Sequence, residues 1–271
     1  MKDLLLSAAI GDICGVPYEF DHPTKDYNKV DLQHPEGDYS DDSVCTFAIA
    51  EAFLKDLNVS ENLWKRCRQD PRRGYGGRFR RWLQTEDRIP YNSLGNGSAM
   101  RCSSAAFIAK DEEECTELAI RSAMPTHNHE EGIKGAVATA RAIFHLLHGK
   151  NKEFIKDEVL GRYYPEWKDK KYEDFHEHFP FDETCPLTVP PAIICFLESK
   201  DYEDCLKLAI ALGGDADTLA AIAGPMAYAH YKVMPQELID NAKKKLPKWM
   251  LDLNEELAQK TSSSDYIHTL R

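Results

Sequence analysis

Long hydrophobic runs are absent from this 271-residue sequence. The apolar stretch at its amino terminus, MKDLLLSAAIGDICG, is too short to span a membrane and is interrupted by Asp12. The stretch also lacks the cleavage pattern of a secretory signal peptide. We therefore expect a chain that has no membrane partner and works in the cytoplasm.

Basic residues are in deficit. The chain has 34 Lys and Arg against 45 Asp and Glu, which gives a formal net charge of −11. A protein that binds nucleic acid without sequence preference needs a basic surface to displace counterions from phosphates, so this class is excluded. With 42% hydrophobic and 29% charged residues, the composition is that of a globular protein with a sizeable core.

Closely spaced cysteines are also lacking. The chain has eight cysteines, and no two of them lie within four positions of each other. Zinc knuckles and CxxC redox pairs both need shorter spacings, so neither is predicted. We expect free thiols, as in a reducing cytosol, and we interpret Cys195 and Cys205 as small core residues.

The alternating pattern typical of β-strands is scarce, and the sequence has no internal repeat and no low-complexity linker. Apolar residues recur instead at helical spacing. The polar stretch 163–186 is interpreted as an ordered surface excursion between helices, and one all-α domain is predicted over residues 1–271. The expected helices run from Leu5 to an end near Gly15 and Pro17, from Val44 to Leu54, from Glu131 to His148, from an opening at Pro190 and Pro191, and around 206–210, 219–226, 238–246 and 249–257.

Two acidic clusters each precede a predicted helix. Ser40, Asp41, Asp42 and Ser43 form one, and Asp215, Asp217 and Thr218 follow Gly213 and Gly214 in the other. Helix capping explains either cluster taken alone, because these side chains accept hydrogen bonds from unpaired N–H groups. If the fold brings the two helix ends together, the carboxylates repel one another unless cations intervene. Oxygen ligands without thiols favour Mg²⁺ or Mn²⁺ over zinc.

Other polar residues have simpler interpretations. The glycines of Tyr75-Gly76-Gly77 and Gly95-Asn96-Gly97-Ser98 permit close approach of the backbone to a ligand, although turns use the same residues. His127 and His129 are two positions apart and do not share one helix face, so they do not indicate a zinc pair. Arg78, Arg80 and Arg81 are interpreted as surface charges, although they follow the glycines at 76 and 77 closely enough that a role as substrate clamps stays open.

Taken in order, five segments resemble the ADP-ribosylglycohydrolase family, which includes the dinitrogenase reductase activating glycohydrolase and the ADP-ribosyl-arginine and ADP-ribosyl-serine hydrolases. The resemblance runs from about residue 4 to about residue 230. It implies a single compact orthogonal helical bundle with two Mg²⁺ or Mn²⁺ ions at the base of a cleft. The segments are GDICGVPYEF (11–20), YSDDS (39–43), NGSAMR (96–101), THNHEEGIKGA (126–136) and GGDADTLAAIAG (213–224).

The resemblance also implies roles for individual residues. The metal ligands would be Ser40, Asp41, Asp42, Asp215, Asp217 and Thr218, with Asp217 bridging the ions and sharing catalysis with Glu19. Glu19 matches an acid placed beside the scissile bond, and Asp12 matches a structural residue. The implied substrate-binding residues are Tyr75, Gly76 and Gly77 near the phosphates, Gly97, Ser98 and Met100 along the ADP-ribose, and His127 near the diphosphate or ribose.

The implied activity is hydrolysis of the glycosidic bond between ADP-ribose and an acceptor, with ADP-ribose as product. The substrate would be an ADP-ribosylated protein or small-molecule conjugate, and the family favours a monomer. Ser40 stands where relatives often have Thr, and its hydroxyl is retained. Two alternatives stay open, a non-catalytic ADP-ribose-binding member of this fold and a different two-metal nucleotide hydrolase. The acceptor is not indicated, and the excursion at 163–186 is a candidate for part of the cleft rim.

Overall fold

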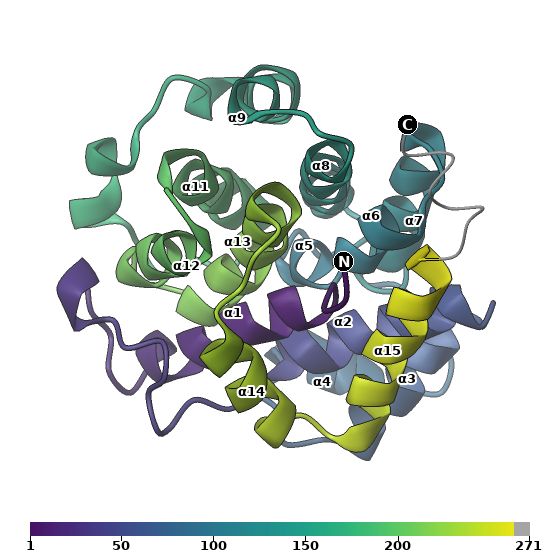
Figure 1. Cartoon of the computed structure of the whole chain (residues 1–271). Helices are drawn as coiled ribbons and strands as arrows, with labels where there is room; N and C mark the ends of the chain where they lie inside the picture. The colour runs from purple at the N-terminus through teal and green to yellow at the C-terminus, as the bar shows by residue number, and fades with distance from the viewer. Residues whose placement is uncertain (263–271) are drawn as a thin grey trace.

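The computed structural model describes residues 1–262, and over that range the chain forms helices joined by turns and loops, with no β-strand (Figure 1). The predicted all-α class is therefore confirmed; residues 263–271 lie outside the described residues. The helices are α1 (Leu6–Glu19), η1 (Tyr27–Lys29), α2 (Asp41–Leu54), α3 (Val59–Gln69), α4 (Gly77–Leu83), α5 (Gly97–Met100), α6 (Ser103–Ile108), α7 (Glu112–Ala123), α8 (Glu130–Leu147), α9 (Lys152–Phe154), η2 (Ile155–Leu160), α10 (Gly161–Tyr163), η3 (Pro165–Trp167), η4 (Tyr172–Asp174), η5 (His176–His178), α11 (Cys185–Glu198), α12 (Tyr202–Ala211), α13 (Ala216–Tyr231), α14 (Gln236–Lys245) and α15 (Lys248–Ser262).

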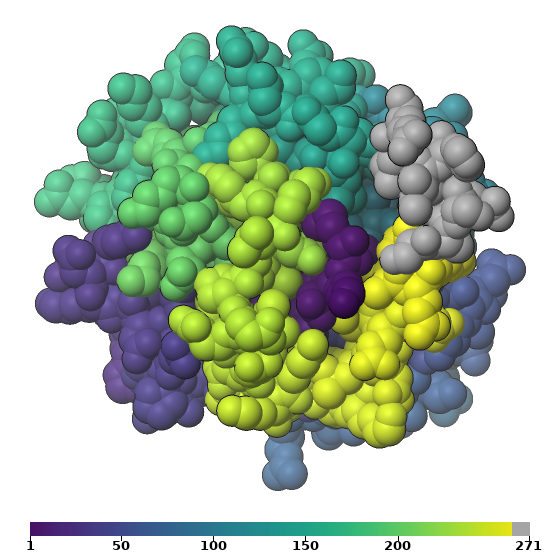
Figure 2. All heavy atoms as spheres, in the orientation of Figure 1, coloured from purple at the N-terminus to yellow at the C-terminus, as the bar shows by residue number. Residues whose placement is uncertain are grey.

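Helices α1 and α13 form the centre of the molecule. They lie against each other along much of their length, and α13 also contacts α8, α11 and α12 (Figure 1). Helix α2 contacts α1, α3 and α6, so it joins the central pair to the opposite side of the core. Figure 2 shows α14 and α15 over one face with the first residues of the chain between them, and there the backbone N–H of Leu5 donates to Asn254 Oδ1 at 3.1 Å.

Two glycines of α1 allow its close packing against α13. A Cβ atom at Gly11 would lie 2.2 Å from the carbonyl oxygen of Ala220, and one at Gly15 would lie 2.3 Å from Cα of Asp217. Both distances are far shorter than van der Waals contact, so a side chain at either position would force the helices apart. The backbone at Asp217 is therefore held directly against α1.

The first helix is longer than predicted. Helix α1 continues through Gly15 and Pro17 and ends at Glu19, so the expected end near Gly15 and Pro17 is wrong. Proline in a helix interior removes one backbone hydrogen bond. Nearly every residue of α1 is buried, and packing against α13 outweighs that loss.

The helix predicted to open at Pro190 and Pro191 starts earlier. Helix α11 begins at Cys185, and both prolines lie inside it and are buried. Its start is fixed from outside the helix, because the backbone N–H of Cys185 donates to the carbonyl of Leu94 at 3.0 Å. That contact between distant segments leaves no local signal in the sequence.

Other predictions are confirmed. Helix α12 ends before Gly213 and Gly214, which have φ angles of +72° and +70°, a backbone region that favours glycine. The 163–186 excursion consists mostly of short 3₁₀ turns between longer helices. All eight cysteines are free and buried.

Among residues 1–262, no helix is long and apolar enough to cross a membrane.

Substitution of Gly15 by alanine should disturb the packing of α1 on α13. We expect Gly15→Ala to lower the free energy of unfolding by about 2 kcal/mol, the usual scale for overpacking a close contact. Gly76→Ala is the matched control, because a Cβ at Gly76 meets no atom within 4 Å. Urea unfolding followed by circular dichroism measures both variants, and equal stabilities would contradict the packing argument.

Candidate active site

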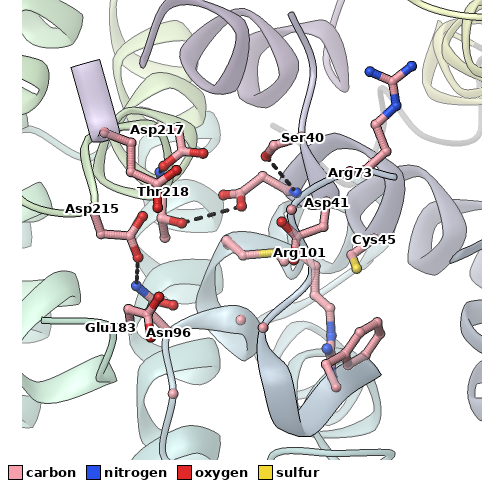
Figure 3. Close-up of a pocket in the computed structure, with 18 of the residues that line it drawn as sticks. Ser40, Asp41, Cys45, Arg73, Asn96, Arg101, Glu183, Asp215, Asp217 and Thr218 are labelled. Atoms are coloured by element: carbon pink, nitrogen blue, oxygen red, sulfur yellow. Dashed lines mark hydrogen bonds between the residues drawn. The ribbon is translucent and has the colours of Figure 1, made fainter. Parts of the chain in front are cut away.

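The amino termini of α2 and α13 meet and together line one cavity. Ser40 caps α2, where its side chain accepts the N–H of Asp42 at 3.1 Å, and Asp215 directly precedes α13. The two ends are in direct contact, because Thr218 Oγ1 donates to Asp42 Oδ2 at 3.3 Å (Figure 3). The structure thus brings together the two acidic clusters that are 173 positions apart, counting from Asp42 to Asp215 (215 − 42).

Asp12 of α1 holds the start of α2 through hydrogen bonds. Its fully buried carboxylate accepts the backbone N–H groups of Ser40 and Ser43, both at 3.0 Å, and the Ser43 hydroxyl. Burial raises the pKa of Asp12 to about 6, and the hydrogen bonds from Ser43 and Ser40 oppose that rise. These contacts agree with the interpretation of Asp12 as a structural residue.

Glu19 ends α1 beside the second acidic cluster. Its carboxylate and those of Asp215 and Asp217 each provide one oxygen, and these three atoms lie within 4.8 Å of one another. Burial, followed by repulsion from the neighbouring Asp215 and Asp41, raises the pKa of Glu19 to about 8. Because α1 continues past Pro17, its last turn delivers Glu19 to this position.

The carboxylates of the site are crowded. Burial, followed by repulsion from Asp12 and Asp215, raises the pKa of Asp41 to about 8. Burial and neighbouring carboxylates also raise the pKa of Asp42 and Asp217 well above their ordinary value. Asp42 Oδ1 is buried without a hydrogen-bond partner. An all-oxygen donor set with an unpartnered buried oxygen suits hard divalent cations such as Mg²⁺ or Mn²⁺.

Asn96 and Glu183 belong to the site although the sequence did not indicate them. The Asn96 amide donates to Asp215 Oδ2 at 2.6 Å and to Thr188 Oγ1 at 3.1 Å, which fixes the Asp215 carboxylate (Figure 3). The backbone N–H of Asn96 donates to the carbonyl of Glu183 at 2.7 Å. Asn96 lies within the NGSAMR segment, but its partner is far away in sequence and could not be predicted.

A cavity of about 510 Å³ opens above the acidic cluster. Tyr75 and Ser98 were expected to bind substrate but do not line it. Tyr75 Oη donates to the carbonyl of Asp70 at 3.0 Å, and Ser98 Oγ donates to that of Gly132 at 2.7 Å. These hydrogen bonds anchor the two glycine-containing segments on the side away from the cavity. The predicted residues that line the cavity are Glu19, Ser40, Asp41, Asp42, Gly76, Gly77, Gly97, Met100, His127, Asp215, Asp217 and Thr218.

Arginine side chains also line the cavity. Arg78 is exposed and also lies on the cavity wall beside Tyr91, so it is placed where it can contact a substrate, whereas the exposed Arg80 and Arg81 do not line the cavity. Arg72, Arg73 and Arg101 line it as well and were missed. The cavity therefore combines an acidic cluster with basic groups. Arg101 is almost wholly buried, and its guanidinium donates to the carbonyl of Ser122 and to Thr126 Oγ1, contacts that leave no local signal in the sequence.

His127 lies on the wall as an uncharged imidazole. Its Nδ1 is 2.7 Å from Thr126 Oγ1, and its Nε2 faces Gly97, where an added Cβ would lie 3.0 Å away. Burial, together with Arg101 and Arg78, holds the pKa of His127 well below its usual range. His129 instead accepts the N–H of Glu131 at the start of α8, in agreement with the absence of a predicted zinc pair.

Lys25 connects two segments that are distant from it in the sequence. Its Nζ donates to the carbonyls of His176, Phe179 and Leu212 at 2.7, 3.2 and 3.0 Å. The first two belong to the 163–186 excursion, and the third directly precedes Gly213 and Gly214. The lysine therefore fastens the excursion to the turn that leads into Asp215.

The described residues form a helical fold in which two acidic helix termini meet at the base of a cavity, and arginine side chains lie on the wall of that cavity. The sequence pattern of the ADP-ribosylglycohydrolase family matches residues 1–266, and the chain belongs to this family.

Individual relatives agree with this assignment. The chain is 25% identical to ADP-ribosylhydrolase ARH3 of Bos taurus, over 85% of this chain and 84% of that protein. It is 26% identical to the ADP-ribosyl-[dinitrogen reductase] glycohydrolase of Rhodospirillum rubrum, over 74% and 72%. A solved ADP-ribosylglycohydrolase-related protein complex shares the fold, with a TM-score of 0.75, 24% identity, and coverage of 95% and 96%.

The crowded carboxylates should make the metal-free protein sensitive to pH. Because the raised pKa values of Glu19 and Asp41 make the folded protein bind more protons than the unfolded chain, its stability falls as pH rises from about 5 to about 8. We expect a loss of about 1 kcal/mol or more over this range. Urea unfolding in a chelator measures it, and added Mn²⁺ should remove the loss. A stability that rises with pH in the chelator would contradict the repulsion.

Proposed function

We propose that this protein is a metal-dependent hydrolase that cleaves the glycosidic bond between ADP-ribose and an acceptor and releases ADP-ribose. The observation that carries this proposal is the meeting of two acidic helix termini, with the unpartnered Asp42 Oδ1 between them, at the base of a cavity that also presents arginines. Family membership and the activities named for ARH3 and the dinitrogen reductase glycohydrolase support it.

Two divalent cations, Mg²⁺ or Mn²⁺, are proposed for the acidic cluster. Ser40, Asp41 and Asp42 would hold them from the α2 side, and Asp215, Asp217 and Thr218 from the α13 side. When bound, such ions neutralise the carboxylates, orient sugar hydroxyls and increase the acidity of water. Asn96 keeps the Asp215 carboxylate in place for this role through its 2.6 Å hydrogen bond.

Glu19 is proposed as the catalytic carboxylate that moves a proton. It lies at the cavity wall next to Asp215 and Asp217, where the scissile bond of a bound conjugate would be near the acidic cluster. Cleavage develops positive charge on the ribose, and a carboxylate beside it stabilises that charge and accepts a proton from the attacking water or returns one to the leaving acceptor.

The diphosphate is proposed to bind at the basic and glycine-rich wall. Gly76 and Gly77 line the cavity, and the space where their Cβ atoms would lie is open, so a ligand can approach the backbone closely. Arg78 lies on the same wall and supplies positive charge. Gly97 and the uncharged His127 face each other further along and would contact the ADP-ribose.

The acceptor is proposed to leave past an acidic and aromatic rim. Phe20 and Phe181 are 68% and 48% exposed, and their ring centroids are 5.6 Å apart. Phe20, Asp21 and Glu183 line the cavity next to Glu19. Aromatic faces with nearby carboxylates favour a planar cation over a neutral hydroxyl group. A guanidinium acceptor therefore fits this rim better than a serine.

Substitutions of Asp217, a proposed metal ligand, and of Glu19, the proposed catalytic carboxylate, test the two roles. Asp217→Asn should lower kcat by about 100-fold or more, the scale of removing one group that stabilises charge in a transition state. Glu19→Gln should lower kcat by about 100-fold or more while ADP-ribose affinity changes little, because general acid–base groups act on the rate. ADP-ribose release and calorimetry measure the two effects.

Three results would overturn this assignment. Full activity of Asp217→Asn would exclude the two-metal site. No turnover of any conjugate, with ADP-ribose still bound, would indicate a non-catalytic binding protein. Release of phosphate from nucleotides, without release of ADP-ribose, would indicate a different two-metal nucleotide hydrolase.

The rim can be tested with a panel of acceptors. We expect kcat/KM for an ADP-ribosylated arginine peptide to exceed that for the matched serine peptide by about tenfold or more, which corresponds to 1.4 kcal/mol of discrimination. Phe20→Ala and Glu183→Gln should each reduce this preference, whereas the exposed Arg80→Gln serves as control. A serine preference in the unmodified protein would contradict the proposed role of the rim.

A further inference from the structure

A second group of metal-ligating side chains lies outside the acidic site. His22, His34 and Glu36 each offer one ligand atom, and these three atoms lie within 4.8 Å of one another. All three residues belong to the loop between α1 and α2, and none of them lines the active-site cavity. The group is therefore distinct from the carboxylates of Asp41, Asp42, Asp215 and Asp217.

The backbone holds these side chains near one another. His22 Nε2 lies 2.7 Å from Glu36 Oε2, and the two imidazole rings have centroids 4.9 Å apart. The backbone N–H of His22 donates to the carbonyl of Pro17 at 2.9 Å, and that of His34 donates to Asp31 at 3.2 Å. The loop is thus already folded with its ligand atoms together, which lowers the entropic cost of binding an ion.

His34 is further fixed by packing on α1. Its ring makes an edge contact with Tyr18 at a centroid distance of 5.7 Å. Gly37, one residue beyond Glu36, packs so tightly that an added Cβ would lie 2.7 Å from the carbonyl oxygen of Ile13. These contacts anchor one side of the group to the buried helix, while His22 and Glu36 remain exposed to solvent.

Two imidazoles and one carboxylate are a donor set that binds zinc, in contrast to the all-oxygen set of the acidic site. We propose that His22, His34 and Glu36 form a second metal site that takes Zn²⁺, with water completing the coordination on the solvent side. The proposal does not depend on the proposed hydrolase function.

Zinc at this site would fasten both ends of one loop. His22 follows Glu19 by three positions, and Glu36 precedes Ser40 by four. The loop residues that line the cavity, Phe20, Asp21, Asp38 and Tyr39, lie immediately outside this pair on either side. Because Zn²⁺ would bind only the folded loop, it would stabilise the protein by mass action and restrain both edges of the cavity.

Zinc binding to the full chain tests the proposal directly. Equilibrium dialysis in excess Mg²⁺, which competes for the all-oxygen site, measures Zn²⁺ bound to the unmodified protein and to His22→Gln and His34→Gln. We expect the two variants to bind one equivalent fewer, or to bind it at least about tenfold more weakly, as loss of a ligand requires. The control is His178→Gln, an exposed histidine outside both groups of potential ligands among the described residues.

Two further measurements need no active enzyme. Zn²⁺ should raise the melting temperature of the unmodified protein and of His178→Gln more than that of the other variants. Co²⁺ bound by the unmodified protein should show the strong visible absorption of a four-coordinate site, and one equivalent of Zn²⁺ should remove it. If all four proteins bind the same amount of Zn²⁺ and Co²⁺ shows only weak absorption, His22 and Glu36 form an ordinary surface ion pair and the proposal is wrong.

Discussion

Mutual repulsion among buried carboxylates is the constraint on which this structure depends. Asp41 and Asp42 at the start of α2 face Asp215 and Asp217 at the start of α13. Burial, followed by repulsion from neighbouring carboxylates, raises the pKa values of Asp41, Asp42 and Asp217. Such a cluster persists only if the surrounding fold holds it rigidly. The packing of α1 against α13 provides that rigidity, because Gly15 allows the backbone at Asp217 to touch α1.

The same packing explains how distant segments build one cleft. Helix α1 contributes Asp12, which binds the start of α2, and Glu19, which ends beside the start of α13. Lys25 then joins the 163–186 excursion to the turn before Asp215. Each of these contacts connects segments next to the acidic cluster to a distant part of the chain. The net charge of −11 therefore reflects, in part, the composition of the site.

Helix class and the acidic clusters could be predicted from the sequence, because helical periodicity and the SDDS and GGDADT segments are local patterns. The end of α1 and the start of α11 could not be predicted. Pro17 is ordinarily a stop signal, and Pro190 and Pro191 ordinarily mark a helix start, but all three lie inside helices that are buried in the folded core. The glycine motifs predicted segments of the cavity wall. They did not show that Gly97 lines the cavity whereas the Ser98 hydroxyl donates to the carbonyl of Gly132 instead.

Residues whose role depends on a distant partner were not predictable. Asn96 donates to Asp215, which lies 119 positions away, and the buried Arg101 lines the cavity because segments distant in the sequence pack together.

The most direct test of the central claim is anomalous diffraction from crystals grown with Mn²⁺. The account predicts anomalous peaks between Asp42 on α2 and Asp217 on α13. A well-ordered cleft without a peak at that position, in crystals saturated with Mn²⁺, would contradict it.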